Sequence, residues 1–141
     1  MNAKVKIGVG VIILNSDNKI LLGLRRGSHG VNTWGLPGGH VDFGETLKEA
    51  VIRETHEETN LTLEQLELVS IADDIMLNED KHYISVGFIC KKYSGTLTIK
   101  EEDKCLQWNW FDLDALPDNI FIPSKKVIDN YRKGIIYLGG K

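Results

Sequence analysis

The stretch Arg53-Glu54-Thr55-His56-Glu57-Glu58-Thr59-Asn60-Leu61 decides the fold of this chain and points to its chemistry. If the stretch is helical, at about 100° per residue, its glutamates share one stripe with apolar side chains. Thr55 falls outside that stripe and is predicted to point away from it. The members of the stripe, all within about 60° of the Glu54 direction, are Leu47, Ala50, Val51, Glu54, Glu57, Glu58 and Leu61.

Carboxylates on an inward-facing stripe need a compensating partner. Like charges crowded on such a face repel one another and lose hydration, so something cationic must balance them. Hard divalent metals prefer oxygen ligands of this kind. The alternative is a solvated charge run, but an ordinary acidic surface would lie opposite the apolar side chains. The arrangement therefore favours a metal site.

Capping signals define the ends of this helix. Thr46 followed by Glu49 is a capping-box pattern, which predicts that the helix begins at Leu47. Asn60 is expected to stop it, because asparagine is second only to glycine in the left-handed conformation that ends helices.

A loop rich in glycine, Trp34-Gly35-Leu36-Pro37-Gly38-Gly39-His40-Val41-Asp42-Phe43-Gly44-Glu45-Thr46, leads into the helix. Gly38 and Gly39 allow the main chain to approach a ligand closely, where a side chain would block it. The loop is therefore expected to deliver main-chain groups to the place where the helix carboxylates lie.

Together, the loop and the helix resemble the Nudix box. Gly39, five residues, Glu45, seven residues and then Arg53-Glu54-x-x-Glu57-Glu58-x-x-Leu61 follow the pattern GX5EX7REUXEEXGU, in which U is a bulky apolar residue. Seven of the nine specified positions match, over 23 residues. Thr55 stands where an apolar residue is usual, and Asn60 replaces the last glycine. Asn60 can adopt the same backbone shape, so neither departure puts the catalytic residues in doubt.

The resemblance implies an α/β fold, the Nudix α/β/α sandwich with a mixed sheet, formed by residues 1–141 as a single domain. It also implies hydrolysis of a nucleoside diphosphate linked to another group. Mg²⁺ is the implied cofactor, and Mn²⁺ is expected to replace it because both ions accept carboxylate and water oxygens. The implied metal ligands are Glu54, Glu57, Glu58 and the main-chain carbonyl of Gly38.

The other catalytic roles also follow from the resemblance. Arg53 is expected to reach back to Glu45 and hold the loop against the helix, so that both residues support the metal-binding carboxylates. Glu54 is our first candidate for the base that orients or deprotonates the attacking water. In the family this base can instead lie on a distal loop, where the candidates are Glu101, Glu102 and Asp103, unless these form only a solvated acidic turn.

Several residues are expected to meet the substrate. Arg25 or Arg26, at the end of a predicted strand, can reach the phosphates, unless both are ordinary surface residues. Gly38 and Gly39 would admit the phosphates closely, and His40 either donates a hydrogen bond to a phosphate or orders the loop. Four aromatic residues either stack on the base or belong to the core. These are Trp34, Tyr83, Trp108 and Trp110.

The finer resemblance concerns the substrate. Residues 21–28, 37–46 and 104–110 are similar to the MutT-like branch of the family, whose members release a nucleoside monophosphate and pyrophosphate from ordinary and modified purine nucleotides. One alternative is a Nudix hydrolase of ADP-ribose or a nucleotide sugar. Another is a non-catalytic Nudix sensor that binds a nucleotide, although a sensor has no need to retain the full glutamate set.

Composition narrows the remaining classes. The length of 141 residues suffices for one core, and 42% hydrophobic with 26% charged residues is ordinary for a globular protein. A net charge of −3 provides no electrostatic attraction for the phosphate backbone of a polynucleotide, so the expected partner is a small nucleotide.

Cys90 and Cys105 suit neither a disulfide framework nor a zinc site and are expected to be buried thiols. The sequence predicts no signal peptide and no membrane partner, hence a cytoplasmic location. The resemblance adds a possible homodimer.

Hydrophobic alternation and turn signals predict the other elements. Trp108 and Trp110 are expected on one face of a strand, and a last helix is expected to start at Pro123 and end at Gly134. The predicted strands cover residues 5–14, 19–25, 34–36, 66–74, 82–92, 97–99 and 107–111.

Overall fold

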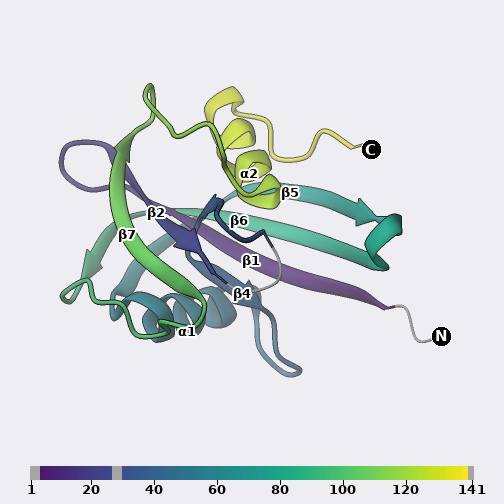
Figure 1. The fold of residues 1–141 in the computed structure, drawn as a ribbon, viewed down its shortest axis with the longest axis horizontal. Helices are drawn as coiled ribbons and strands as arrows, with labels where there is room; N and C mark the ends of the chain where they lie inside the picture. Colours follow the sequence, from purple (N-terminus) through teal and green to yellow (C-terminus); the bar gives the residue numbers. More distant parts are fainter. Residues whose placement is uncertain (1–3, 27–29, 140–141) are drawn as a thin grey trace.

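Two β-sheets lie between two helices in the computed structural model, which describes residues 4–26 and 30–139 (Figure 1). One sheet has the order β4-β1-β6-β5 and is mixed, because β1 runs parallel to β6 and antiparallel to β4. The other has the order β3-β2-β7 and is antiparallel. In chain order the elements are β1 (Val5–Ile13), β2 (Lys19–Arg25), β3 (Trp34–Gly35), β4 (Gly38–His40), α1 (Leu47–Thr59), β5 (Thr62–Met76), the 3-10 helix η1 (Leu77–Glu79), β6 (Lys81–Ser94), β7 (Cys105–Asp112) and α2 (Ile122–Lys133).

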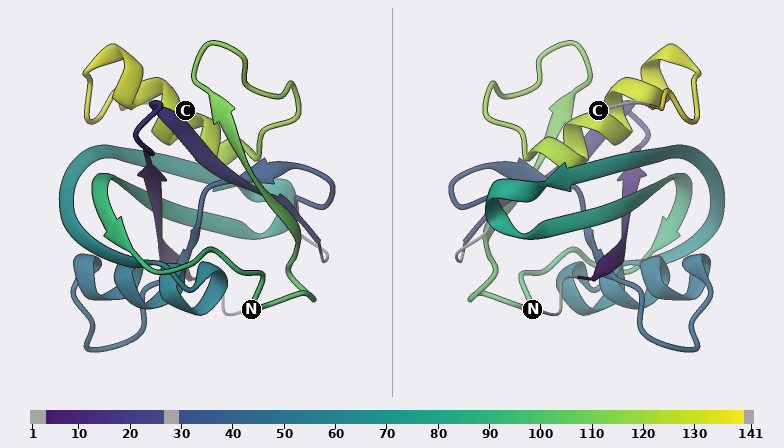
Figure 2. Two further views of the ribbon diagram at one scale, coloured as in Figure 1. Left: turned by 90° about the vertical axis from the view of Figure 1, so that its left-hand side faces the viewer. Right: turned by 90° about the vertical axis from the view of Figure 1, so that its right-hand side faces the viewer.

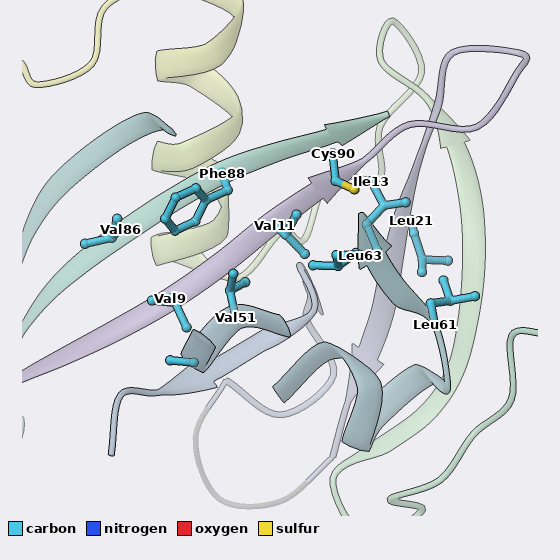
Figure 3. Packing of buried hydrophobic residues seen from close by; sticks show 11 residues of the cluster. Val9, Val11, Ile13, Leu21, Val51, Leu61, Leu63, Val86, Phe88 and Cys90 are labelled. Atoms are coloured by element: carbon cyan, nitrogen blue, oxygen red, sulfur yellow. The ribbon is translucent and has the colours of Figure 1, made fainter. Parts of the chain in front are cut away.

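The helices cover opposite sides of the sheets, as Figure 2 shows, which confirms the predicted α/β fold with a mixed sheet. Alternation along β1 explains the two cores that result. Val9, Val11 and Ile13 pack toward α1 in one cluster, seen in Figure 3. Ile12 and Leu14 join the cluster on the α2 side. Within the described residues, no helix is long and apolar enough to cross a membrane.

Both predicted ends of α1 are confirmed. The Thr46 hydroxyl accepts a hydrogen bond from the Glu49 N–H at 3.1 Å, and the Glu49 carboxylate accepts one from the Thr46 N–H at 2.8 Å. Asn60 ends the helix in the left-handed conformation, with φ 69°. These signals are local, so the sequence alone was sufficient to place them.

The buried face of α1 is rotated away from the predicted stripe. Thr55 is fully buried, at about 100° from Glu54, so placing it outside the inward face was wrong. Leu47, which was expected inside, is exposed. The contacts of α1 with β1, β4 and β5 determine which side packs inward. The residues buried on α1 are Ala50, Val51, Thr55 and Thr59.

Thr55→Val is expected to leave catalysis unchanged and to stabilise the fold slightly, by up to about 1 kcal/mol. The buried Thr55 hydroxyl has no hydrogen-bond partner, so valine removes an unpaired polar atom at nearly constant volume. Thr59→Val is the matched control. The Thr59 hydroxyl donates to the Thr55 carbonyl at 2.7 Å and accepts from the Leu61 N–H at 3.1 Å, so its loss should lower the melting temperature. Equal melting curves for both variants would contradict this assignment of the buried face.

Two segments differ from the sequence prediction. Gly38–His40, expected in a loop, forms β4 and pairs with β1, with Gly38 opposite Gly10. Residues 97–99, expected to be a strand, are not one. Their segment instead caps the C-terminus of α1, because the Thr98 N–H donates to the Thr59 carbonyl at 3.0 Å. The last carbonyls of a helix have no intrahelical hydrogen-bond donors. The hydrogen bonds that this segment donates to them outweigh its strand propensity.

Candidate active site

A cleft of about 410 Å³ lies where α1, β4 and the end of β2 meet the loop before β7. Its lining brings together acids from α1 with acids and a lysine from that loop, and two arginines from β2 and the residue after it. The charged side chains that line it are Glu54, Glu58, Glu101, Asp103, Arg25, Arg26 and Lys104. The structure therefore gathers acidic and cationic side chains around one cleft, as binding of an anion together with a metal requires.

Glu58 lies deepest among the helix carboxylates. Desolvation raises its pKa to about 8, and the nearby negative charges of Glu54 and Glu101 add to the rise. The Gly38 N–H, which donates to Glu58 Oε1 at 3.0 Å, and the charge of Arg25 oppose it. The ionised form of Glu58 is therefore disfavoured in the metal-free site, and a cation bound in the cleft would stabilise it.

Glu54 packs directly against β4. Burial raises its pKa, while the hydrogen bond from Arg53 lowers it (Nη1–Oε1 2.8 Å). A Cβ atom on Gly39 would fall 1.9 Å from Glu54 Oε2. Gly38 has φ 156°, and a Cβ atom there would fall 1.9 Å from the Val9 carbonyl oxygen. Both glycines thus admit the protein's own groups, whereas the sequence suggested only a ligand.

Gly39→Ala is expected to leave the protein folded and to lower kcat/KM by about a hundredfold. The new methyl group meets the flexible end of Glu54, which must move out of place. Gly38→Ala provides the contrast, because its methyl group meets backbone and should abolish folding. Circular dichroism and steady-state kinetics separate the two effects. Wild-type activity in Gly39→Ala would show that the position of Glu54 does not matter.

Arg53 connects the loop to the helix, as the sequence predicted. Its Nε donates to Glu45 Oε2 at 2.6 Å, and its Nη2 donates to Glu45 Oε1 at 3.0 Å and to the His40 carbonyl at 3.1 Å. The bond from Arg53 lowers the pKa of Glu45, and the same bond is the largest cause of the raised pKa of Arg53. The guanidinium also lies 3.3 Å from Asp42. Arg53 therefore connects α1 to β4 through the His40 carbonyl, and to the loop before α1 through Glu45.

Glu57 is more exposed than Glu54, with which it shares one hydrogen-bond donor, Arg53 Nη1. Its side chain is 49% exposed, accepts a bond from Arg53 Nη1 at 2.9 Å and does not line the cleft. Across the described ranges, no three acid, histidine or cysteine side chains are gathered closely enough to surround a metal ion. Of the three glutamates expected to bind metal, Glu54 and Glu58 line the cleft and Glu57 does not, so a role of Glu57 in metal binding stays a prediction. Glu54 and Glu58 alone still fit Mg²⁺, which needs few protein oxygens and keeps several waters.

Of the two arginines, Arg25 reaches furthest into the site. It lines the cleft and also a second cavity of about 140 Å³ on the other side of β4. Its guanidinium carbon lies 3.9 Å from the centre of the Phe121 ring. Desolvation lowers the pKa of Arg25, and the negative charge of Glu58 opposes that shift. Arg26 lies at the rim, where its Nη1 donates to the Glu102 carbonyl at 3.3 Å.

The second cavity has a mixed lining. His40 stacks on Tyr83 with ring centres 5.5 Å apart, and both line it together with Phe121. Ser85 and Ser124 supply its hydroxyl groups. Of the candidate aromatic residues, Tyr83 lies in this cavity and Trp108 in the cleft. The other two pack within the protein, Trp34 edge-on to Phe111 and Trp110 stacked on Tyr93.

The loop before β7 carries the three acids that were candidates for a catalytic base outside α1. Glu101 and Asp103 line the cleft, whereas Glu102 does not. Lys104, which the sequence did not single out, also lines it, and the charge of Glu101 raises its pKa. Cys105, expected to be buried, is only partly so and lies in the cleft, where desolvation raises its pKa to about 11. No local pattern marks Lys104, Cys105 or Phe121, because each depends on contacts distant in sequence.

Comparison with known proteins shows which family the chain matches. The model of the family described as "NUDIX domain" matches residues 4–131. An ADP-ribose pyrophosphatase of Methanocaldococcus jannaschii is 36% identical over 86% of this chain and 70% of its own length. An RNA pyrophosphohydrolase of Pelagibacter ubique is 30% identical over 84% and 83%. A MutT NUDIX hydrolase of Burkholderia pseudomallei superposes with a TM-score of 0.86 at 31% identity, over 90% of this chain and 98% of its own.

Proposed function

Since this chain belongs to the Nudix family and is a pyrophosphohydrolase of that family, we propose that it hydrolyses nucleoside triphosphates to a nucleoside monophosphate and pyrophosphate. Ordinary and modified purine nucleotides are the proposed substrates, and Mg²⁺ is the proposed cofactor. The observation that carries the proposal is the pair Glu54 and Glu58, desolvated and held against Gly38 and Gly39, beside a cavity large enough for part of a nucleoside.

The two cavities suggest how the substrate lies. They share Arg25, Leu36, Gly38 and Gly39 as a common wall. The phosphate chain would lie in the charged cleft, and the base of the nucleoside would lie in the smaller cavity, whose aromatic and hydroxyl groups suit it. The bond next to the nucleoside would then lie at the common wall. This placement favours attack at the nucleoside end of the triphosphate, so that pyrophosphate leaves from the charged cleft.

Roles for the chain's own residues follow. Nudix hydrolases generally use divalent metal. Mg²⁺, when bound, would neutralise phosphate charge and lower the pKa of a bound water. Glu54 and Glu58 would hold it, and the Gly38 carbonyl is the further ligand that the resemblance implies. Arg53 and Glu45 keep these groups in place, and Glu54 remains our first candidate for the base, with Glu101 as the alternative on the loop.

The chemistry can be tested by product analysis in ¹⁸O-labelled water with a panel of nucleoside triphosphates. We expect a labelled monophosphate, unlabelled pyrophosphate and no nucleoside diphosphate as the initial products; label in the pyrophosphate would mean that water attacks the neighbouring phosphorus instead. Accumulation of nucleoside diphosphate and orthophosphate would show that the enzyme does not cleave the bond between the first and second phosphates. Glu54→Gln and Glu101→Gln, compared over the same pH range, would show which carboxylate serves as the base, because only the base variant should lose the acidic limb of the profile.

A second candidate is hydrolysis of ADP-ribose or a nucleotide sugar. The observation that favours it is the identity of 36% with the Methanocaldococcus jannaschii protein named ADP-ribose pyrophosphatase. ADP-ribose, a nucleotide sugar and a 5′-triphosphorylated RNA therefore belong in the same panel. Turnover confined to ADP-ribose would move the protein to this candidate, and tight binding with no turnover of any compound would support the non-catalytic sensor.

A further inference from the structure

Arg25 lies in an unusual position for a strand-end arginine. It borders both cavities, and it is largely desolvated. It also feels the negative charge of Glu58, toward which an unrestrained guanidinium would be drawn. Such a contact would neutralise a carboxylate that the proposed function needs for metal. Contacts that restrain the guanidinium therefore help to hold Arg25 at the common wall of the two cavities.

Phe121 is placed to do so. The Arg25 guanidinium stacks on its ring at 3.9 Å. Gly30 closes the stack, because a Cβ atom there would lie 2.5 Å from the Phe121 ring and 3.1 Å from Arg25 Nε. Gly35 lies under the arginine stem, where a Cβ atom would approach Arg25 Cδ to 3.3 Å. The guanidinium is thus confined between an aromatic face and glycine backbone.

The ring itself is anchored by main-chain hydrogen bonds. The Phe121 N–H donates to the Trp34 carbonyl at 2.8 Å, and the Trp34 N–H donates to the Asn119 carbonyl at 2.9 Å. This segment extends the three-stranded sheet in parallel to β3 and then begins α2. Phe121 is therefore fixed by backbone, independently of the side chains in the cleft.

We propose that Phe121 is a positioning residue that holds Arg25 at the junction of the two cavities, so that Arg25 binds a phosphate group of the substrate. This inference rests on the proposed function, in which the phosphate chain crosses that junction. The π face fixes the plane of the guanidinium, and guanidinium–phosphate pairs form in that plane through the N–H groups at its edge. A cation stacked on an aromatic face still carries its full charge, so the interaction restrains Arg25 without neutralising it.

Kinetics of ring variants test the role. Phe121→Leu keeps an apolar wall but removes the π face, and should lower kcat/KM about tenfold, mainly through KM. Phe121→Tyr keeps the ring and should restore near wild-type values. Ile122→Ala, at a neighbouring side chain that is 64% exposed, is the control for disturbance of the start of α2 and should have no effect. In an Arg25→Ala background, Phe121→Leu should lose most of its effect, because the part that acts through Arg25 is gone and only the direct contact of Phe121 with the smaller cavity remains.

A second measurement does not depend on turnover. In ¹H–¹⁵N spectra, the Arg25 Nε–H signal, assigned with Arg25→Lys, should be displaced by the ring in wild type and in Phe121→Tyr but not in Phe121→Leu. Inorganic pyrophosphate with Mg²⁺ should shift this signal in wild type. An Arg25 signal unmoved by pyrophosphate, or a Phe121→Leu effect that persists undiminished without Arg25, would overturn the proposal. If wild type cleaves no triphosphate, the proposed function fails, and the pyrophosphate titration alone decides the role of Phe121.

Discussion

Glu58→Gln is expected to lower kcat by about a thousandfold and, at pH 8, to raise the melting temperature of the metal-free protein. Glutamine keeps the oxygen that accepts the Gly38 N–H, so the contact with β4 survives. What it removes is a charge that the desolvated site holds at a cost and that metal binding requires. The same substitution should therefore harm activity and help stability.

The sign of the stability change depends on pH. Burial raises the pKa of Glu58 to about 8, above the ordinary value of 4.5 for a glutamate. Between these values the folded protein keeps a proton that the unfolded chain has released, so stability falls as pH rises through this window. Above about pH 8 the full cost of the buried charge is present. Glu58→Gln removes this cost, so its gain of about 1–3 kcal/mol should appear above pH 8 and vanish below pH 4.5.

Glu57→Gln is the matched control, because it makes the same chemical change one residue away on α1. The Glu57 side chain is exposed and pairs with Arg53 outside the cleft. We expect a loss of activity of at most about tenfold and no gain in melting temperature with pH. Equal loss of kcat in both variants would instead support the expectation from the resemblance that Glu57 binds metal together with Glu54 and Glu58.

The contrast between these two glutamates shows what the sequence could and could not predict. The ends of α1 depend on Thr46, Glu49 and Asn60, whose interactions are local, and both were predicted correctly. The face that α1 buries depends on how it rests on the sheets, and a stripe centred on Glu54 misplaced it by tens of degrees. An error of this size leaves the bounds of the helix unchanged, but it affects which of its side chains reach the cleft, and Glu57 does not line it.

Long-range contacts account for the other differences. The Nudix box brought Arg53 and Glu45 together correctly, because the spacing in the sequence encodes their meeting across the loop. Phe121, in contrast, meets Arg25 across almost a hundred positions, and no pattern near either residue indicates it. The sequence predicted a strand at residues 97–99, whereas hydrogen bonding to the C-terminal carbonyls of α1 determines their conformation. Local signals thus predicted elements, and the tertiary packing placed the side chains.

Removing divalent metal is expected to abolish turnover entirely while leaving the fold intact. Without a metal ion, the four acids that line the cleft would repel an entering phosphate chain, and the three cationic side chains that line it would not balance both the acids and the phosphates. Excess EDTA should therefore stop hydrolysis, and added Mg²⁺ or Mn²⁺ should restore it. Circular dichroism in EDTA should show the native spectrum. Full turnover in excess EDTA would refute the metal mechanism.

The metal requirement should also change with pH, because Mg²⁺ must displace the proton that Glu58 holds below its pKa of about 8. The concentration of Mg²⁺ for half-maximal activity should fall by up to about tenfold for each unit of rising pH, and should level off above pH 8. Thermal melts provide a measure that needs no turnover, because a metal that binds only the folded state raises the melting temperature. That rise should grow from pH 6.5 to 8.5 in wild type and be nearly absent in Glu58→Gln. An Mg²⁺ requirement that is the same at all three of pH 6.5, 7.5 and 8.5 would mean that Glu58 is already ionised, and that the cleft compensates its charge by other groups.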